Sequence, residues 1–211
     1  MIPTKEEWTN ALNDRHGIEL QNKISSATVA ICGLGGLGSN IAIVLARAGV
    51  GRLILIDFDK VEVTNLHRQQ YKANQVGMNK THALQDNLKE INPYLETKIH
   101  TVHLDENNAK DILSDADIVC EAFDNAQEKA SLVNFVLSQM PEKYIVAASG
   151  MAGLYSANTI KTRKVSKRFY LCGDEKSDVA DSIGLVASRV AVCASHQSHM
   201  VLRIISEIFE E

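Results

Sequence analysis

An α/β fold, with a mostly parallel sheet covered by helices on both faces, is predicted by three features of the sequence. Short β-branched apolar runs alternate along the chain with segments whose apolar residues recur at helical spacing. A glycine-rich turn lies between the first predicted strand and the helix that follows it. Hydrophobic residues make up 45% of the chain and charged residues 23%, values typical of a packed core. Strand and helix alternation of this kind indicates βαβ units, in which successive strands lie parallel.

Residues 1–27 are expected to form a helical amino-terminal arm. Thr4 and Glu7 have the spacing of a capping box. Trp8 and Leu12 follow at helical spacing. The arm therefore begins with an amphipathic helix that precedes the first strand.

Strands and helices are expected to alternate over residues 28–150, the predicted nucleotide-binding core. The strands are the apolar runs TVAIC, RLILID, TKIHTVHL, DIVCEA and YIVAAS. The helices are expected over residues 37–48, Lys80–Ile91, 107–113 and 126–140. Gly49 is expected to end the first of these helices as a C-cap.

Residues 151–211 are expected to hold edge strands, a mobile loop and a carboxyl-terminal helix. The run GLYSANTIKTRKVSKRFYLC predicts one or two strands, antiparallel at the sheet edge. The acidic run GDEKSDVADS predicts the loop, and the helix is expected from about Leu185. No Pro/Gly/Ser-rich linker interrupts the 211 residues, so a single domain over residues 1–211 is expected.

Composition and charge disfavour several classes of protein. No apolar run approaches the roughly 20 residues that span a bilayer, and the start lacks a signal-peptide pattern, so a cytoplasmic protein without a membrane partner is expected. The net charge of −4 argues against a nucleic-acid-binding body. The four cysteines form no CxxC pair, so reduced thiols are expected and a zinc site is not. These cysteines are Cys32, Cys120, Cys172 and Cys193.

The glycine-rich turn predicts a nucleotide site in a Rossmann-like, doubly wound fold. Gly33, Gly35 and Gly38 satisfy GxGxxG between a strand and a helix, and Gly36 lies within the same turn. Glycine allows a tight turn and lets backbone N–H groups approach phosphate oxygens at a helix N-terminus. Asp57 ends the second strand, where a carboxylate binds ribose hydroxyls. The alternative is a structural turn without a ligand.

The polar segment after Asp57 favours ATP over NAD as the nucleotide. Its side chains follow the carboxyl end of a strand, where open α/β sheets bind ligands. Arg and Lys neutralise charge on transferring phosphoryl groups, whereas hydride transfer requires no such cations. An NAD(P)-dependent oxidoreductase is the alternative enzyme. The side chains concerned are Asp59, Asn65, Arg68, Gln69 and Lys80.

Several ordered motifs resemble the ThiF/MoeB/HesA family of adenylyltransferases, relatives of ubiquitin-activating enzymes. They are GLGGLGSNIAIVLARAGVGRLILIDFDKVEVTNLHRQ, GMNKTHAL, INP and DIVCEAFDNAQEKASLVN, within about residues 15–150. The similarity is closest to short ThiF-like proteins that activate sulfur carriers for thiamine synthesis. The resemblance implies adenylylation of the carboxyl-terminal glycine of a small ubiquitin-fold carrier that ends in Gly-Gly, with ATP and Mg²⁺ as cofactors and release of pyrophosphate.

Family roles carry over where the residues match. The resemblance implies these contacts: Asp57 to ribose, Asn65, Arg68 and Lys80 to phosphates with Gln69 in the same network, and Asp124 to Mg²⁺. Arg15 matches an arginine that reaches the ATP of a partner subunit, which implies a homodimer. Longer relatives hold zinc on two CxxC pairs, which this chain lacks. Some relatives use a loop cysteine as a nucleophile, and Cys172 is the candidate here.

Each of these roles has an alternative. Asp59, Asn65 and Asp124 are also typical helix N-caps. Arg68, Lys80 and Arg15 are also explained as solvated surface charges, and Cys172 as a packing residue whose acidic neighbours raise its pKa.

The basic run at residues 161–168, KTRKVSKR, has two explanations. Its positive charge is complementary to an acidic carrier surface or to an RNA. It is also typical of an edge strand whose charges prevent pairing with a strand of another molecule. A related family adenylates a tRNA nucleoside, so that activity is a further alternative, although no RNA-binding module is evident. A nucleotide-gated scaffold that binds a carrier without activating it is the non-enzymatic alternative.

Overall fold

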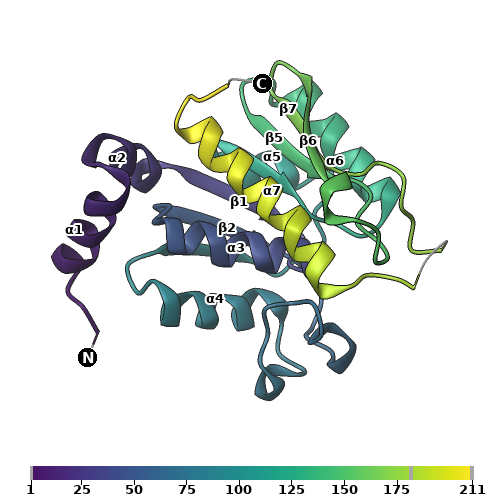
Figure 1. Ribbon diagram of the computed structural model, residues 1–211, viewed down its shortest axis with the longest axis horizontal. Helices are drawn as coiled ribbons and strands as arrows, with labels where there is room; N and C mark the ends of the chain where they lie inside the picture. The colour runs from purple at the N-terminus through teal and green to yellow at the C-terminus, as the bar shows by residue number, and fades with distance from the viewer. Residues whose placement is uncertain (1, 181–182, 210–211) are drawn as a thin grey trace.

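Strands and helices alternate along the chain, from α1 near the amino terminus to α7 (Figure 1). The computed structural model describes residues 2–180 and 183–209, so residues 181–182 of the predicted acidic loop lie outside the described residues. The helices are α1 (Lys5–His16), α2 (Ile18–Ser26), α3 (Gly36–Ala48), α4 (Lys80–Ile91), α5 (Ala109–Leu113), α6 (Ala126–Gln139) and α7 (Ala187–Ile205). The strands are β1 (Thr28–Cys32), β2 (Arg52–Ile56), β3 (Glu96–His100), β4 (Ile118–Glu121), β5 (Tyr144–Ala148), β6 (Lys161–Ser166) and β7 (Phe169–Gly173). Short 3₁₀ helices lie at Val63–Asn65, Ala73–Gln75 and Ala157–Thr159.

The strands form one sheet in the order β3-β2-β1-β4-β5-β7-β6. Neighbouring strands are parallel except at one edge, where β6 runs antiparallel to β7. In β1, Val29 lies opposite Leu53 of β2 on one side and Ile118 of β4 on the other. The predicted Rossmann-like, mostly parallel sheet with an antiparallel edge toward the carboxyl terminus is confirmed.

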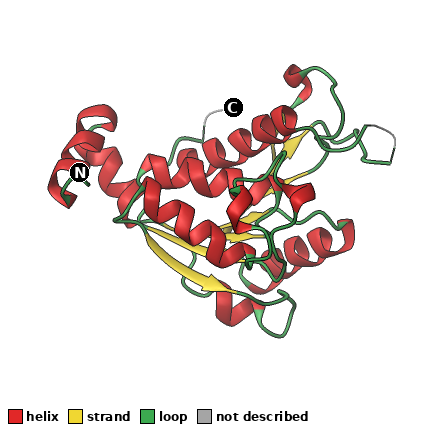
Figure 2. Cartoon of the chain, turned by 90° about the horizontal axis from the view of Figure 1, so that it is seen from below, coloured by secondary structure: helices red, strands yellow, loops and turns green. Residues whose placement is uncertain are grey.

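Helices cover both faces of the sheet, which is why its strands are apolar on both sides (Figure 2). Val29 and Ile31 of β1 belong to a cluster that includes residues of α3, α4 and α7, which lie side by side in front of the sheet in Figure 1. Ala30 and Cys32 belong to a second cluster with residues of α5 and α6. Successive residues of one strand thus pack against opposite layers.

Two predicted elements differ from the structure. The third strand, expected over residues 97–104, ends at His100, and Leu104 instead packs against the cluster under α5 and α6. The arm contains two helices because Gly17, with φ +83°, separates α1 from α2. The expected capping box is confirmed: Glu7 N donates to Thr4 Oγ1 at 3.2 Å, and Thr4 N donates to Glu7 Oε2 at 2.7 Å.

The arm lies beside the amino-terminal end of β1, at the left of Figure 1. α1 buries none of its side chains. A Cβ on Gly49, at the end of α3, would meet Gln21 Nε2 at 2.5 Å and Leu12 Cδ1 at 2.6 Å, so the arm contacts that end of α3. Among residues 2–180 and 183–209, no helix combines the length and apolarity needed to cross a membrane.

Candidate functional site

The glycine turn lies where the strand order reverses, between β1 and β4. Open α/β sheets bind ligands at this position, at the carboxyl ends of the strands. A cavity of about 630 Å³ opens there. Its lining comes from the glycine turn, the segment after β2, the ends of β4 and β5, and residues near the start of α7.

Two glycines of the turn, Gly33 and Gly38, are required by close backbone contacts. Gly33 has φ +92°, and a Cβ there would lie 2.8 Å from the Ala122 carbonyl oxygen. A Cβ on Gly38 would lie 1.8 Å from the Gly33 carbonyl oxygen. Gly33 also lines the cavity, together with Gly35 and Gly36. The turn therefore uses glycine both to pack helix against strand and to leave the backbone exposed to a ligand.

Asp57 holds the glycine turn from the end of β2. Its two carboxylate oxygens accept N–H bonds, Oδ2 from Leu34 at 2.6 Å and Oδ1 from Asp59 at 2.8 Å. Burial raises the pKa of the Asp57 carboxyl, while Lys80 and the two N–H donors oppose that rise. Asp57 lines the cavity as well, so one side chain supports the turn and faces the ligand space.

Lys80 brings a buried positive charge to the cavity from the first turn of α4. The residue is 6% exposed, and its Nζ lies 2.7 Å from Asp59 Oδ2 and 3.9 Å from Asp57 Oδ2. A lysine this buried is paired rather than a solvated surface charge. The geometry therefore disfavours the surface-charge interpretation of Lys80.

Arg68 and Gln69 also line the cavity, and each retains an unsatisfied polar atom. Arg68 Nε and Gln69 Oε1 are buried and have no hydrogen-bond partner among the described residues. Arg68 Nη1 donates to the Thr64 carbonyl at 3.2 Å. Buried polar groups without partners are uncommon in native proteins and are typical of sites completed by a ligand or water.

Asp124 lines the cavity from the loop after β4 and is exposed. The N-cap of α6 is its neighbour Asn125, whose side chain accepts from Gln127 N at 2.9 Å and Glu128 N at 3.1 Å. Asp124 is thus not the helix cap, the alternative considered from sequence. No group of three metal-binding side chains occurs among the described residues. A single carboxylate nevertheless suits Mg²⁺, which proteins commonly hold through one or two carboxylates together with substrate phosphates.

Four predicted site residues lie outside the cavity. One is Gly38, which packs against the Gly33 carbonyl and is absent from the cavity lining. Asn65 Oδ1 accepts from Glu62 N at 3.1 Å, a local turn bond, and Asn65 is absent from the cavity lining. Arg15 is exposed on α1, at the opposite end of the sheet. Cys172 lies within β7 rather than beside a loop and is fully buried, and burial raises the pKa of its thiol to about 11. This placement favours packing over a nucleophilic role for Cys172.

Sequence reasoning missed a buried ion pair below the cavity. Glu121, at the end of β4, is fully buried, and burial raises the pKa of its carboxyl while Lys129 lowers it. Lys129 Nζ donates to Glu121 Oε1 at 3.0 Å and to the Phe123 carbonyl at 2.9 Å. An acid at the end of the apolar run IVCEA was the available signal. The pair fixes the backbone just before Asp124.

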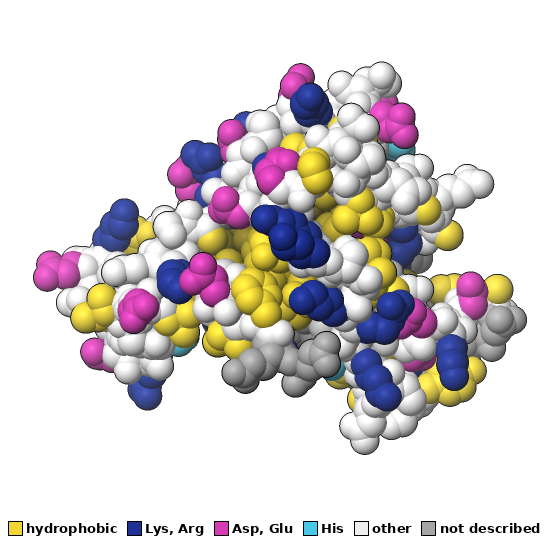
Figure 3. Space-filling view, turned by 90° about the horizontal axis from the view of Figure 1, so that it is seen from above, with side chains coloured by type: hydrophobic (Ala, Val, Ile, Leu, Met, Phe, Trp, Pro, Cys, Tyr) yellow, Lys and Arg dark blue, Asp and Glu magenta, His cyan; other side chains and the backbone are white. Residues whose placement is uncertain are grey.

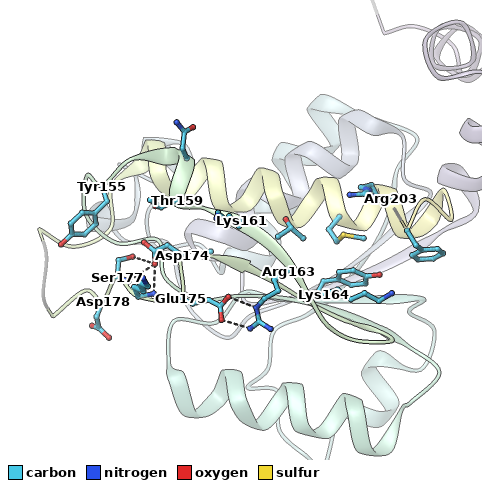
Figure 4. Close-up of a pocket in the computed structure, with 17 residues that line it drawn as sticks. Tyr155, Thr159, Lys161, Arg163, Lys164, Asp174, Glu175, Ser177, Asp178 and Arg203 are labelled. Atoms are coloured by element: carbon cyan, nitrogen blue, oxygen red, sulfur yellow. Dashed lines mark hydrogen bonds and ion pairs between the residues drawn. The ribbon is translucent and has the colours of Figure 1, made fainter. Parts of the chain in front are cut away.

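A second cavity of about 1000 Å³ follows β6 (Figure 4). All six residues of β6 are exposed, and Lys161, Arg163 and Lys164 line this groove. Arg163 makes a two-bond ion pair with Glu175, at 2.9 and 2.7 Å, drawn as dashed lines in Figure 4. Figure 3 shows Lys and Arg side chains beside apolar side chains across the middle of one face.

One segment separates the two cavities. Ser177 and Asp178 line both of them. Asp174 anchors this segment: its Oδ1 accepts from the backbone N of Lys176 and of Ser177, each at 2.9 Å, and its Oδ2 pairs with the buried Arg189 of α7. The groove and the nucleotide-sized cavity are therefore neighbours across a short stretch of backbone.

Comparison with known proteins shows the family. Residues 9–211 match the ThiF family. The chain belongs to the ThiF family. This confirms the resemblance seen in the sequence motifs.

Curated relatives match part of their own length. The ThiF-family chain is 44% identical over 115 residues to the adenylyltransferase and sulfurtransferase MOCS3 of Caenorhabditis briggsae, covering 54% of this chain and 29% of the relative. It is 38% identical over 128 residues to the sulfur carrier protein adenylyltransferase of Thermus thermophilus, covering 56% of this chain and 47% of the relative. The chain thus spans less than half the length of these relatives.

Solved structures share the fold of this ThiF-family chain. The Escherichia coli tRNA N6-threonylcarbamoyladenosine dehydratase TcdA, in complex with ATP, has a TM-score of 0.86 and 20% identity, with 98% of both chains covered. Escherichia coli MccB with ATP has a TM-score of 0.72 and 22% identity, covering 92% of this chain and 60% of MccB. The shared Rossmann-like architecture extends over nearly the whole chain in the first case.

Proposed function

We propose that this chain binds ATP in the cavity between β1 and β4 and adenylylates the carboxyl-terminal glycine of a small sulfur carrier. The carrier would have a ubiquitin-like fold and end in Gly-Gly, as in thiamine synthesis. The observation that carries the proposal is the convergence of Arg68, Lys80 and Asp124 on a glycine-lined cavity. Membership of the ThiF family and the similarity to the sulfur carrier protein adenylyltransferase of Thermus thermophilus support it.

The chemistry follows from the residues around the cavity. A carrier carboxylate oxygen attacks the α-phosphorus of ATP, the bond to the bridging oxygen breaks, and pyrophosphate leaves with its electron pair. Arg68 and Lys80 offset the negative charge that shifts toward the leaving pyrophosphate. Asp57 accepts from the ribose hydroxyls. Mg²⁺ held by Asp124 would supply further charge neutralisation.

No general base is required, because a carboxylate is ionised at neutral pH and is itself the nucleophile. Catalysis then depends on positioning the carboxylate in line with the scissile bond and on stabilising phosphate charge. The strand ends around the cavity suit that task, since the glycine turn, Asp57 and Asp124 follow closely after the buried strands β1, β2 and β4.

The groove along β6 supports a protein substrate. Its volume of about 1000 Å³ exceeds that of the nucleotide cavity, and its Lys161 and Lys164 would attract an acidic carrier face. Because Ser177 and Asp178 line both spaces, an extended carboxyl-terminal tail that crosses this segment would reach the nucleotide from the groove.

ATP–pyrophosphate exchange with and without a Gly-Gly carrier tests the proposal. We expect carrier-dependent exchange in the wild-type protein and a loss of at least about 100-fold in Asp124→Ala, as expected for a group that stabilises transferring phosphate charge. Asp86→Ala is the matched control, because Asp86 is exposed on α4 and absent from the cavity lining.

Each outcome separates the alternatives. ATP binding without exchange, for every carrier tested, would favour a non-catalytic scaffold. Binding of NAD but not of ATP would establish the oxidoreductase alternative. Exchange that depends on tRNA and not on a carrier protein would assign the nucleoside-modifying activity.

A further inference from the structure

The backbone of Leu34, at the centre of the glycine turn, is held on both sides of its Cα. Its N–H donates to Asp57 Oδ2 at 2.6 Å. Its carbonyl accepts from the Tyr71 hydroxyl at 2.7 Å. Leu34 is fully buried and Tyr71 is 8% exposed, so water does not replace either bond. Burial raises the pKa of the Tyr71 phenol, so the hydroxyl remains a donor at every pH at which the protein would be assayed.

This arrangement fixes where the next N–H group points. No peptide bond among the described residues is cis, and in a planar trans peptide the C=O and the following N–H point in opposite directions. Since the Leu34 carbonyl points inward to Tyr71, the Gly35 N–H points away from Tyr71. Gly35 lines the cavity whereas Leu34 does not. The Gly35 N–H has no acceptor within residues 2–180 and 183–209.

Tyr71 belongs to a segment that is bonded repeatedly to the glycine turn and α3. Gln70 N donates to Ser39 Oγ at 3.1 Å, and Asn40 Nδ2 donates to the Arg68 carbonyl at 3.1 Å. The same stretch places the Arg68 and Gln69 side chains in the cavity. In this stretch, the side chains of Arg68 and Gln69 therefore face the cavity, whereas Gln70 bonds to α3 and Tyr71 bonds to the glycine turn.

We propose that Tyr71 is a positioning residue that orients the Gly35 N–H toward a nucleotide phosphate. The inference rests on the proposed function, because it requires a phosphate in the cavity. Removing the hydroxyl leaves the Leu34 carbonyl buried without a partner, and such groups favour alternative backbone orientations that restore a bond. The Tyr71 ring would still fill its place in the core. Removal of the Tyr71 hydroxyl should therefore weaken binding of the nucleotide phosphates.

The test compares ATP with adenosine in Tyr71→Phe. Binding of both ligands to the wild-type chain and the variant is measured, by calorimetry for ATP and by ligand-observed NMR for adenosine. We expect the Kd for ATP to rise roughly three- to tenfold, as for loss of one hydrogen bond, with the Kd for adenosine unchanged. Adenosine lacks the phosphates, so a general loss of structure would weaken both ligands alike.

Tyr170→Phe is the matched control. Tyr170 is also buried, at 5% exposed, but its hydroxyl has no hydrogen-bond partner among the described residues. Its loss should leave both dissociation constants unchanged. An unchanged ratio of ATP to adenosine affinity in Tyr71→Phe, with ATP bound by the wild-type chain, would overturn this inference alone. Failure of the wild-type chain to bind ATP would overturn the proposed function and this inference with it.

Discussion

At the scale of single residues, the side chains around the nucleotide-sized cavity are of two kinds. Asp57 and Lys80 already have partners within the protein, and they hold the turn and the start of α4 in place. Arg68 and Gln69 each keep a buried polar atom without a partner among the described residues. Asp124 is exposed and is released from capping by Asn125. The cavity thus combines two side chains that also support the fold with three that keep binding capacity for a ligand.

The cysteines provide a test at the residue scale. All four are buried, and burial raises the pKa of Cys172 to about 11 and that of Cys193 to about 12. A thiol whose pKa is raised carries less thiolate at pH 8, and the thiolate is the reactive form. We expect less than one equivalent of thiol per chain to react with a disulfide reagent at pH 8 in the folded protein. All four thiols should react in denaturant.

The Cys172→Ser variant provides the control for that titration. It should react like the wild-type protein while folded and retain carrier-dependent exchange. Rapid labelling of one thiol in the folded protein, lost in this variant, would instead support the nucleophilic role that its burial disfavours.

At the scale of elements, the turn from β1 to α3 uses glycine for two separate reasons. Gly38 is required by the backbone, since a Cβ would lie 1.8 Å from the Gly33 carbonyl oxygen. Gly35 has open space around it, with Gln69 Nε2 the nearest atom at 3.8 Å from a Cβ. Gly38 therefore allows α3 to pack closely against the end of β1, and Gly35 leaves the backbone at the cavity wall uncovered by a side chain.

Alanine substitutions separate these two reasons. Gly38→Ala should lower the free energy of unfolding by about 3 kcal/mol or more, because backbone rather than a flexible side chain must move. Gly35→Ala should stay within about 0.5 kcal/mol of the wild-type value and weaken ATP binding instead. Urea denaturation and calorimetry measure the two effects. Equal destabilisation by both substitutions would contradict this division.

The elements could be predicted where local pattern and tertiary packing agree. The apolar residues of the central strands and of α3 are buried in the core, so the local sequence pattern and the tertiary packing favour the same elements. The strand expected over residues 97–104 was too long because alternating residues continue past His100, although the chain there leaves the sheet. Gly17 was not identified as a helix break. Its effect depends on φ +83°, which a glycine permits but does not dictate.

The candidate site was predicted in outline from motif and strand position. Asp57, Arg68, Gln69, Lys80 and Asp124 do line one cavity. The pairing of Glu121 with Lys129 and the Tyr71 bond to the glycine turn were not predicted. Both depend on which side chains meet in the folded core, and sequence spacing does not encode that information.

At the scale of the whole molecule, the arm and the cavity lie at opposite ends of β1. Arg15 on α1 is beside the amino-terminal end, and the glycine turn follows the carboxyl end. An Arg15 side chain therefore has no access to the cavity of its own chain. If Arg15 contacts ATP, as the family resemblance implies, the contact is made in a homodimer, and that is our proposal for it.

Mixing two inactive variants tests the proposal for Arg15. Arg15→Ala and Asp124→Ala should each abolish exchange alone. In a mixed dimer, the Arg15→Ala subunit keeps its own Asp124 and receives Arg15 from its partner, so one site works. We expect exchange to recover to about a quarter of the wild-type rate after subunit mixing, because half of the dimers are mixed and each has one working site. A mixture that stays inactive would place Arg15 in its own chain's site or outside catalysis.

The position of α7 bears on how the chain acquires its structure during synthesis. α7 packs along α3 and against β5, β6 and β7, and it supplies Val190, Cys193 and Val201 to one apolar cluster. Its Gln197 bonds to carbonyls of both Glu121 and Val146, which joins β4 to β5. Every one of these partners leaves the ribosome before α7 does. The part of that face that α7 covers therefore stays exposed until translation of α7 is finished, and in this interval the apolar residues beneath α7 expose the nascent chain to aggregation.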